Sequence, residues 1–375
     1  MDFDLSKPQK LLKDAARDLL SRHCPPEKVR ELMASETAHD DVLWQEIVDQ
    51  GWTGITTPEE FGGLNLTTVE LAVIAEEMGR ACLPGAFMSG VFAGALIGEA
   101  GNEEQKKRYL EPLALGEINA TVAFLEDDTA WNADSLSVCS KSDANGIILD
   151  GKKRFVADAG IADLIICAAQ NGDGFMLLPV ERDSPGLSIT PSPSMDETRK
   201  IFDVDLASVH VESRNILGAD GDAKGAFRRA LNTATIAACA EMVGVMQWSL
   251  DATIEYVKTR QQFGKPIGVY QAVQHQCADM LLFTESSRSA TYYAAWALSV
   301  NDPESALAVS TAKAYCSDAV REVCNRAVQL HGGIGFTWEH DLQLYYKRSK
   351  YSETLFGDAI YHREIIARSI VDQAI

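Results

Sequence analysis

The hydrophobic pattern of the first third of the chain is helical. Leu12, Ala15 and Leu19 recur at the spacing of one helical face, and Pro25 stops this run. Further helices are expected over 42–48, 68–82 and 103–110, and a stretch rich in small residues occupies 90–98. The pattern therefore predicts an N-terminal helical region.

The period of the pattern changes near residue 120. Short apolar or alternating runs follow one another, and Asp-Gly, Asn-Gly and Gly-Asp turns separate them. The expected strands are 121–124, 136–139, 146–149, 164–167, 175–180 and 209–211. This block predicts a small antiparallel β-domain.

Helical periodicity returns after the small and acidic stretch 218–225 and continues to the end. Long amphipathic helices are expected over 226–259, 270–300, 303–330 and 351–372. Long helices with short connections indicate a helical bundle. The predicted fold class is therefore α+β and multidomain, with a helical domain over 1–118, a middle β-domain over 119–218 and a C-terminal bundle domain over 219–375.

Composition and charge narrow the class of protein. The 375 residues carry a formal net charge of −20, with 46% hydrophobic and 23% charged residues. These values are typical of a globular protein, and the negative field argues against binding to nucleic acid or to an anionic membrane surface. No apolar run reaches the roughly 18 residues of a membrane span.

Cysteine and histidine spacing bears on the compartment and on metals. The eight cysteines form no C-x-x-C pair, and the chain starts without a secretory leader. We therefore expect a cytoplasmic protein with reduced thiols. Neither H-E-x-x-H nor H-x-x-E-H spacing occurs, so no metal site is expected.

The segment that ends the first long C-terminal helix contains residues suited to an anion and a flat ring. It reads Arg260-Gln261-Gln262-Phe263-Gly264-Lys265-Pro266-Ile267. A guanidinium suits phosphate oxygens, and an aromatic ring offers a stacking face. The alternative is that the Gly and the Pro only terminate the helix.

A second Gly-rich segment follows the third long C-terminal helix. Gly332, Gly333 and Gly335 come directly after His331. A Rossmann turn would need a strand before the glycines, whereas a helix precedes them here. A hydrolase oxyanion loop is disfavoured because no G-x-S-x-G elbow occurs. On local grounds the leading alternative is a left-handed helix C-cap.

Together these motifs resemble the acyl-CoA dehydrogenase family over nearly the whole chain. Pro58–Gly63 and Glu76–Arg80 resemble its N-terminal helical domain, and 150–157 resembles the strand of its β-domain that lines the flavin. Residues 260–274 and 329–335 resemble its two flavin-binding segments. The resemblance implies the family fold, with an N-terminal helical domain, a middle β-domain and a C-terminal four-helix bundle.

The resemblance also implies FAD as the cofactor. In the family, the Arg and Phe of the first segment reach the FAD of a neighbouring subunit, and the glycines of the second segment permit close backbone approach. The cofactor-binding residues implied here are Arg260, Gln262, Phe263, Ile267, Tyr270, Gln271, Gln329, Gly332, Gly333, Phe155 and Ala157.

The strand that contacts the flavin departs from the family pattern. The usual Thr-Glu-Pro segment is replaced by Leu125–Trp131, and Phe155-Val156-Ala157 stands in place of the usual Trp-x-Thr. Backbone groups would therefore have to contact the isoalloxazine ring in place of these side chains.

The catalytic base of the family is also missing. The Glu that most members carry near the C-terminus is replaced by Phe356, and a second family position for the base is occupied by Ala234, followed by Thr235. Because the α-proton of a thioester is weakly acidic, desaturation still requires a carboxylate. Glu241 lies two helical turns after Ala234 in a small, apolar stretch, and we predict that it is the general base.

The structural alternative for Glu241 is a buried carboxylate held by an arginine or a backbone donor. Glu353 and Asp358 are weaker candidates for the base, because the family's C-terminal segment directs only position 356 at the substrate.

The Phe-Gly-Asp ending resembles family members that act on bulky, cyclic or dicarboxylic acyl-CoA thioesters, including steroid side-chain and pimeloyl-type enzymes. The function implied is FAD-dependent α,β-dehydrogenation of such a thioester in fatty acid or steroid catabolism, with electrons passed to electron-transfer flavoprotein. The assembly implied is a homo-oligomer, such as a tetramer, or a heteromer with a paralogous subunit. Two alternatives stay open: a non-catalytic partner subunit, and a flavin monooxygenase on the same fold.

Overall fold

The computed structural model describes residues 4–127, 131, 136–142, 146–172, 174–218 and 221–371. Contacts divide the chain into two compact units. We call them the bundle unit, which comprises Met1–Arg30, Thr68–Leu83 and Thr235–Ile375, and the sheet unit, which comprises Glu31–Thr67 and Pro84–Ala234. The first 118 residues contribute to both units, and the three-domain division of the sequence stays a prediction.

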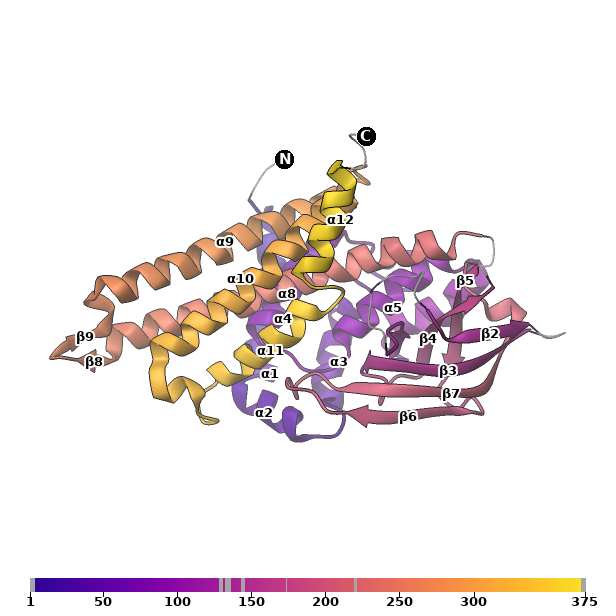
Figure 1. The fold of residues 1–375 in the computed structure, drawn as a ribbon, viewed down its shortest axis with the longest axis horizontal. Coiled ribbons are helices and arrows are strands. Elements are labelled where there is room, and N and C mark those ends of the chain that lie inside the picture. Colours follow the sequence, from indigo (N-terminus) through magenta and orange to yellow (C-terminus); the bar gives the residue numbers. More distant parts are fainter. Residues whose placement is uncertain are drawn as a thin grey trace. The chain divides into compact units, whose positions relative to one another are not determined.

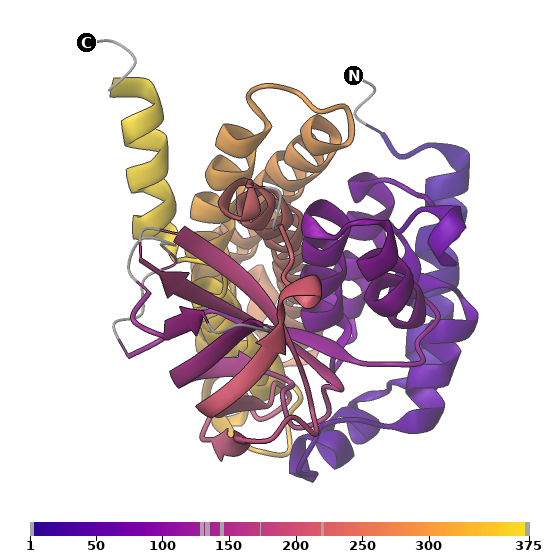
Figure 2. The same ribbon diagram turned by 90° about the vertical axis from the view of Figure 1, so that its right-hand side faces the viewer.

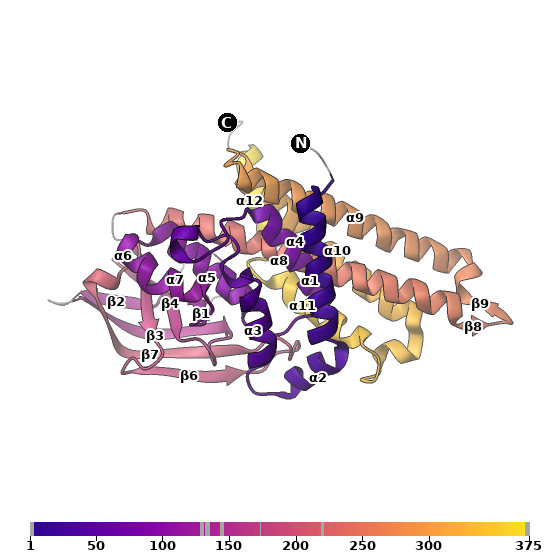
Figure 3. The same cartoon turned by 180° about the vertical axis from the view of Figure 1, so that it is seen from behind.

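The bundle unit consists of long helices. They are α1 (Lys7–His23), α4 (Thr68–Arg80), the part of α8 (Ala223–Thr259) from Thr235 onward, α9 (Gln271–Ser299), α10 (Ser305–His331), α11 (Leu342–Thr354) and α12 (Ala359–Val371). Helix α10 packs against α9, α11 and α12 (Figure 1). Helix α1 packs against α4 (Figure 3), and it begins at a capping box in which Ser6 and Gln9 satisfy each other's backbone N–H groups.

Three of the four predicted C-terminal helices are confirmed, but the expected helix over 351–372 is interrupted. Helix α11 ends at Thr354 and α12 begins at Ala359. Phe356 and Gly357 lie between them with φ angles of 60° and 99°. A right-handed helix cannot continue through residues in that region of φ, so the chain turns instead.

Helices α4 and α8 approach each other backbone to backbone in the bundle unit. A Cβ atom on Gly79 would lie 2.0 Å from the carbonyl oxygen of Glu241, and one on Gly244 would lie 1.9 Å from that of Glu76. Only glycine fits at either position without moving the partner helix. This close approach places the side chain of Glu241 at the crossing of two helices.

The sheet unit is built on one sheet. Its strands are β1 (Ala120–Ala123), β2 (Cys139–Ser142), β3 (Gly146–Ala157), β4 (Leu164–Asn171), β5 (Gly174–Glu181), β6 (Leu187–Ser192) and β7 (Ile201–Glu212). The strand order is β1-β4-β2-β3-β7-β6, and β5 also pairs with β4. Figure 2 shows the strands of this sheet from a second side. The apolar run from Leu164 to Ala169 of β4 is buried at every position, so both faces of this strand are covered.

Most strand pairs are antiparallel, as predicted, but β1 pairs with β4 in parallel, and β2 meets β4 in parallel through Cys139 and Gln170. The chain between β1 and β4 carries β2 and β3, and a connection of that length permits parallel pairing. Strand β6 was not predicted, because the Ser- and Pro-rich sequence around it resembles a loop. Its half-exposed edge position tolerates Pro191.

Shorter helices complete the sheet unit. They are α3 (Asp41–Asp49), α5 (Phe87–Ala100), α6 (Glu103–Gln105) and α7 (Glu111–Ala114), while α2 (Pro26–Ala34) begins in the bundle unit. Helix α1 ends at His23, before Pro25, as predicted, and Pro26 then occupies the first position of α2, where its missing N–H costs nothing. Helix α5 covers the small-residue stretch 90–98 and packs on β1.

No helix in the described part of the chain is long and apolar enough to cross a membrane. Within the same residues, no group of three or more His, Cys, Asp or Glu side chains is arranged to hold a metal ion.

Candidate active site

The first predicted flavin segment folds as a tight hairpin after α8. Strands β8 (Gln261–Gln262) and β9 (Lys265–Pro266) pair antiparallel around Phe263 and Gly264, whose φ angles are 52° and 76°. Two positive φ values in a two-residue connection define a type I′ turn. The Phe263 side chain is 91% exposed, so the hairpin presents an aromatic ring to solvent.

The remaining residues of this segment lie close to the hairpin. Tyr270 Oη donates a hydrogen bond to the Gln262 carbonyl at 3.2 Å, and its ring meets that of Phe263 edge to face at 6.4 Å. Ile267 donates its N–H to the Arg260 carbonyl at 2.8 Å. Within the part of the chain that the structure describes, no ion pair or side-chain hydrogen bond engages the exposed guanidinium of Arg260. Gln271 is the first residue of α9.

The second predicted segment leaves space where a ligand could approach. Helix α10 ends at His331, and Gly332 adopts φ 64°. A Cβ atom added to Gly332 or to Gly333 would meet nothing within 4 Å. Gln329 and Gly333 are exposed. A helix C-cap explains the positive φ of Gly332 but does not require the open space beside both glycines.

One contact joins the two predicted segments within the bundle unit. Tyr256, on the last turns of α8, donates from Oη to the His331 carbonyl at 3.1 Å, and the two rings stack at 4.3 Å. We call the resulting region, Arg260–Gln271 with Gln329–Phe336, the hairpin end. The nine predicted cofactor residues of the bundle unit therefore lie on two segments, one that follows α8 and one that ends α10, and the Tyr256–His331 contact links these two helices next to them.

The other two predicted cofactor residues belong to the sheet unit. Phe155 and Ala157 lie on β3, where the pairing with β7 shifts between Lys153 and Val156. This β-bulge holds Phe155 at φ 53° with 48% of its surface exposed. Bulges often redirect a side chain beside a functional site, and Phe155 is redirected here.

Three phenylalanines in the described chain, Phe155, Phe263 and Phe356, have positive φ angles between 52° and 60°. A bulky side chain in this region is strained by about 1–3 kcal/mol, and such strain is concentrated at functional sites. Each of the three falls on a segment that the sequence assigned to the flavin or to the base. Each of these predicted segments therefore contains one strained aromatic residue.

The predicted base, Glu241, forms a buried ion pair. Its Oε1 accepts a hydrogen bond from Nη1 of Arg348 on α11, and the two side chains are 1% and 0% exposed. Arg348 also donates from Nη2 to the Leu83 carbonyl at 3.1 Å, just beyond the end of α4. We call this region, with Gly79 and Gly244, the helix crossing. The ion pair with Arg348 is the structural alternative that the sequence analysis raised for Glu241. The role of Glu241 as the general base stays a prediction.

The two weaker candidates for the base also have partners. Asp358 Oδ1 accepts the N–H of Tyr361 at 2.8 Å at the start of α12. Glu353 lies 3.5 Å from Arg321 and 3.9 Å from Lys350. Neither carboxylate is isolated in an apolar environment.

The segment after β1, where Leu125–Trp131 replaces the family's usual Thr-Glu-Pro, is stabilised by another buried ion pair. Glu126 lies 2.5 Å from the fully buried ammonium of Lys153, and it accepts the N–H of Val138 at 3.0 Å. Burial opposes ionisation, but hydrogen bonds from Lys153 and Ser137 hold the pKa of Glu126 below its usual value. The neighbouring Asp128, Thr129 and Ala130 lie outside the described residues.

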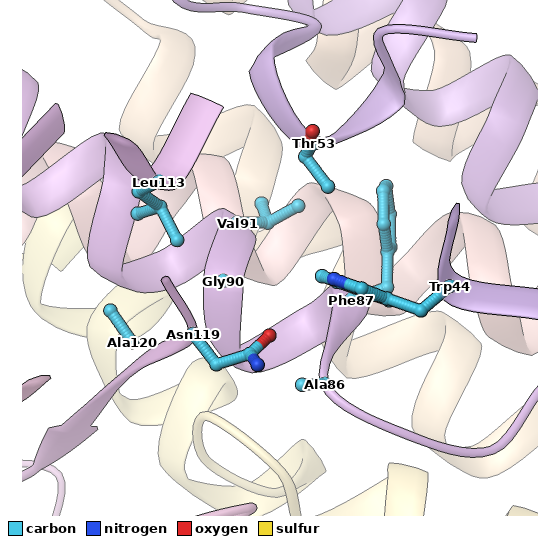
Figure 4. Close-up of a pocket in the computed structure, with 9 residues that line it drawn as sticks. All are labelled: Trp44, Thr53, Ala86, Phe87, Gly90, Val91, Leu113, Asn119 and Ala120. Atoms are coloured by element: carbon cyan, nitrogen blue, oxygen red, sulfur yellow. The ribbon is translucent and has the colours of Figure 1, made fainter. Parts of the chain in front are cut away.

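Among the hollows in the described part of the sheet unit are a groove and a small cavity, and no predicted site residue lines either of them. A groove of about 590 Å³ is lined by Arg182, Arg199 and Lys200, whose side chains donate to backbone carbonyls. A cavity of about 10 Å³ lies beside Trp44 and Asn119 (Figure 4). Among the described residues, Trp44 Nε1 and Asn119 Oδ1 have no hydrogen-bond partner, and the cavity has room for about one water.

Sequence reasoning did not find the partner groups that hold these segments. Arg348, Lys313 and His362 are buried side chains that contact the helix crossing or the turn between α11 and α12. Arg348 lies in a polar, Lys- and Tyr-rich run, and nothing in its spacing marks it as buried. A lysine in the otherwise apolar face of α10 was the one available signal for Lys313.

Comparisons with known proteins agree with this arrangement. A family model described as "Acyl-CoA dehydrogenase, N-terminal domain" matches residues 6–117, and one described as "Acyl-CoA dehydrogenase, C-terminal domain" matches 225–371. The acyl-CoA dehydrogenase IpdE2 of Mycolicibacterium smegmatis is 33% identical over 354 residues, which cover 94% of this chain and 96% of that protein. The chain belongs to the acyl-CoA dehydrogenase family of flavoprotein oxidoreductases.

Two solved structures extend the comparison. A steroid ACAD variant is 28% identical, with a TM-score of 0.89 over 98% of this chain and 99% of its own. An acyl-CoA dehydrogenase from Bacillus anthracis, solved in complex with FAD, is 26% identical, with a TM-score of 0.90 over 99% of this chain and 68% of its own. The predicted family fold is confirmed.

Proposed function

We propose that this chain catalyses the FAD-dependent α,β-dehydrogenation of an acyl-CoA thioester and passes the electrons to electron-transfer flavoprotein. The observation that carries the proposal is the hairpin end. There an exposed, unpaired Arg260, an exposed Phe263 and open space at Gly332 and Gly333 lie together without a structural need for any of them. The related Bacillus anthracis enzyme, which contains FAD, supports the cofactor.

The residues of the hairpin end would hold the cofactor as follows. Arg260 would pair with the pyrophosphate through its guanidinium, because no carboxylate in the described chain competes for it. Phe263 would pack against the cofactor, and Gly332 and Gly333 would allow the backbone to approach it. Bound FAD supplies the acceptor for the hydride that leaves Cβ of the thioester.

The substrate we propose is a bulky, cyclic or dicarboxylic acyl group. Similarity to a steroid ACAD supports this class. Phe356 supports it as well, because an apolar ring in place of the usual Glu changes the shape and the charge of the position.

A second candidate function is that of a partner subunit in a heteromer. One observation favours it: Glu241, the carboxylate assigned to proton abstraction, is committed to Arg348, and Phe356 cannot accept a proton. Under this reading a paralogous subunit supplies the base, and this chain supplies flavin contacts or shape.

The test is to purify the chain alone and together with a paralogous subunit. A yellow protein with a flavin spectrum is expected in both cases. Anaerobic mixing with short linear, cyclic and dicarboxylic acyl-CoA thioesters should bleach the flavin, and cyclic or dicarboxylic thioesters should act fastest. Bleaching only with the paralogue present selects the partner-subunit function. A colourless protein that stays without FAD under all conditions contradicts both.

A further inference from the structure

The turn between α11 and α12 has a strained backbone. It comprises Leu355–Asp358, with Phe356 at φ 60° and Gly357 at φ 99°. A Cβ atom on Gly357 would lie 2.3 Å from Cδ1 of Tyr361, so only glycine fits there. Phe356 is buried, and a left-handed conformation is unfavourable for a bulky residue. Contacts from elsewhere in the bundle unit must therefore hold the turn.

Lys313 holds the turn from α10. Its side chain is fully buried, and Nζ donates hydrogen bonds to the Gly357 carbonyl at 2.8 Å, to the Glu353 carbonyl at 3.0 Å and to Ser317 Oγ at 2.8 Å. The Ser352 carbonyl lies 3.3 Å away. The last carbonyls of a helix lack partners within the helix and carry its negative end. One ammonium therefore satisfies the C-terminal end of α11 and the turn together.

His362 holds the turn from α12. Its ring is 4% exposed, and Nε2 lies 3.0 Å from the Phe356 carbonyl. A carbonyl oxygen only accepts hydrogen bonds, so Nε2 carries the proton. Burial lowers the pKa of His362 to about 4, and the imidazole is therefore neutral near pH 7. The consecutive carbonyls of Phe356 and Gly357 are thus held by two different helices.

We propose that Lys313 and His362 are positioning residues, which clamp the turn from two helices and fix the side chain of residue 356 in one orientation during turnover of the acyl-CoA thioester. The proposal rests on the proposed function, in which residue 356 occupies the position of the usual base and Phe356 contributes shape to the acyl site. A misplacement of about 1 Å in such a site can cost roughly 10² in rate.

Two pairs of variants test the proposal. Lys313→Met removes the ammonium and keeps an unbranched side chain, and Lys350→Met on α11 is the control, since Lys350 contacts Glu353 and Tyr346 but not the turn carbonyls. His362→Leu removes the donor to Phe356, whereas His362→Gln keeps an N–H in its place. Should Lys313→Met fail to fold, the His362 pair decides.

Two measurements are made on each variant. Hydrogen exchange of the amides at 355–358 should be about tenfold faster or more in Lys313→Met and His362→Leu. The rate constant of flavin reduction at saturating thioester should fall by roughly tenfold or more in the same two variants, with a smaller change in KM and equal flavin content. Lys350→Met and His362→Gln should resemble the parent in both measurements.

Each of the following outcomes contradicts one part of the proposal. Unchanged exchange at 355–358 contradicts the clamp itself. Faster exchange with unchanged reduction means that the clamp serves only the fold, and the positioning role is wrong. If no thioester reduces the parent flavin, the proposed function fails and the role in turnover fails with it, while the exchange data still decide whether the clamp exists.

Discussion

The helix crossing and the hairpin end both belong to the bundle unit, but their charged side chains differ in burial and in pairing. At the helix crossing, Glu241 and Arg348 are 1% and 0% exposed and neutralise each other. At the hairpin end, Phe263 is 91% exposed, and no ion pair within the described chain engages Arg260. A charge that the fold has already paired is committed to stability, whereas a charge left unpaired beside an exposed aromatic ring is available to a ligand.

The comparison shows why local context misleads at the helix crossing. An acidic residue among small apolar neighbours is either paired or functional, and the sequence does not show its partner. Arg348 lies more than a hundred residues away from Glu241 along the chain and meets it only in the folded state. The Arg260 segment is different, because its residues are neighbours in sequence and its hairpin geometry is local.

The largest expected effect is at the helix crossing. Glu241→Gln leaves the buried charge of Arg348 without its counter-charge and should lower the free energy of unfolding by about 3–5 kcal/mol. Glu364→Gln is the control, because its pair with Arg368 at 2.8 Å is mostly exposed and should be worth about 0–1 kcal/mol. Denaturant unfolding measures both.

The same variant separates the two roles of Glu241. If Glu241→Gln is as stable as the parent, retains its yellow flavin and reduces it roughly 10² more slowly with thioester, Glu241 is the general base. If its stability falls while the folded fraction reduces flavin at the parent rate, the carboxylate serves the fold.

The next effect concerns pH and the turn between α11 and α12. The pKa of His362 is about 4 in the folded protein, whereas its ordinary value, which holds in the unfolded chain, is 6.5. Between pH 6.5 and pH 4 the unfolded chain therefore binds more protons at this site than the folded protein does. The free energy of unfolding should therefore fall by up to about 3 kcal/mol between pH 6.5 and pH 4 on account of this group.

His362→Gln removes that titration. The variant should lose less stability than the parent over the same pH interval, as measured by urea unfolding at several pH values. Parallel curves for the two proteins would mean that His362 is not held neutral by burial.

At the hairpin end the expected effect is on the cofactor. A charge-assisted hydrogen bond to phosphate contributes about 1.5–3 kcal/mol, so Arg260→Ala should weaken FAD retention by roughly tenfold or more with little change in stability. Lys258→Ala is the control, because that exposed lysine pairs with Glu255. Flavin content after dialysis measures the difference, and equal retention in the two variants would reduce the segment to a helix stop.

The smallest expected effect is on stability at Phe263. Phe263→Gly relieves a left-handed aromatic residue and should leave the free energy of unfolding unchanged or raise it by up to about 1 kcal/mol. FAD retention should nevertheless fall, because the exposed ring is lost. A variant that is both less stable and fully loaded with flavin would show that the ring serves the fold.

Most of the helices and strands, and the two segments predicted to bind the flavin, could be located from the sequence. Periods of 3.6 and 2 separated helices from strands, and the local chemistry of Arg260–Ile267 and of the glycines after His331 needs no distant partner to be recognised. The sequence also predicts that the family's usual base is absent, since Phe356 stands at its expected position and cannot accept a proton.

The tertiary structure alone decided which charges are paired and how the turn near the C-terminus is built. The sequence predicted one helix over 351–372, but residues from α10 and α12 stabilise a left-handed turn at Phe356 and Gly357. It could not identify Arg348 as the partner of Glu241, or the close approach of Gly79 and Gly244. Helix and strand formation depend on neighbours in sequence, whereas burial and pairing of charges depend on residues that only folding brings together.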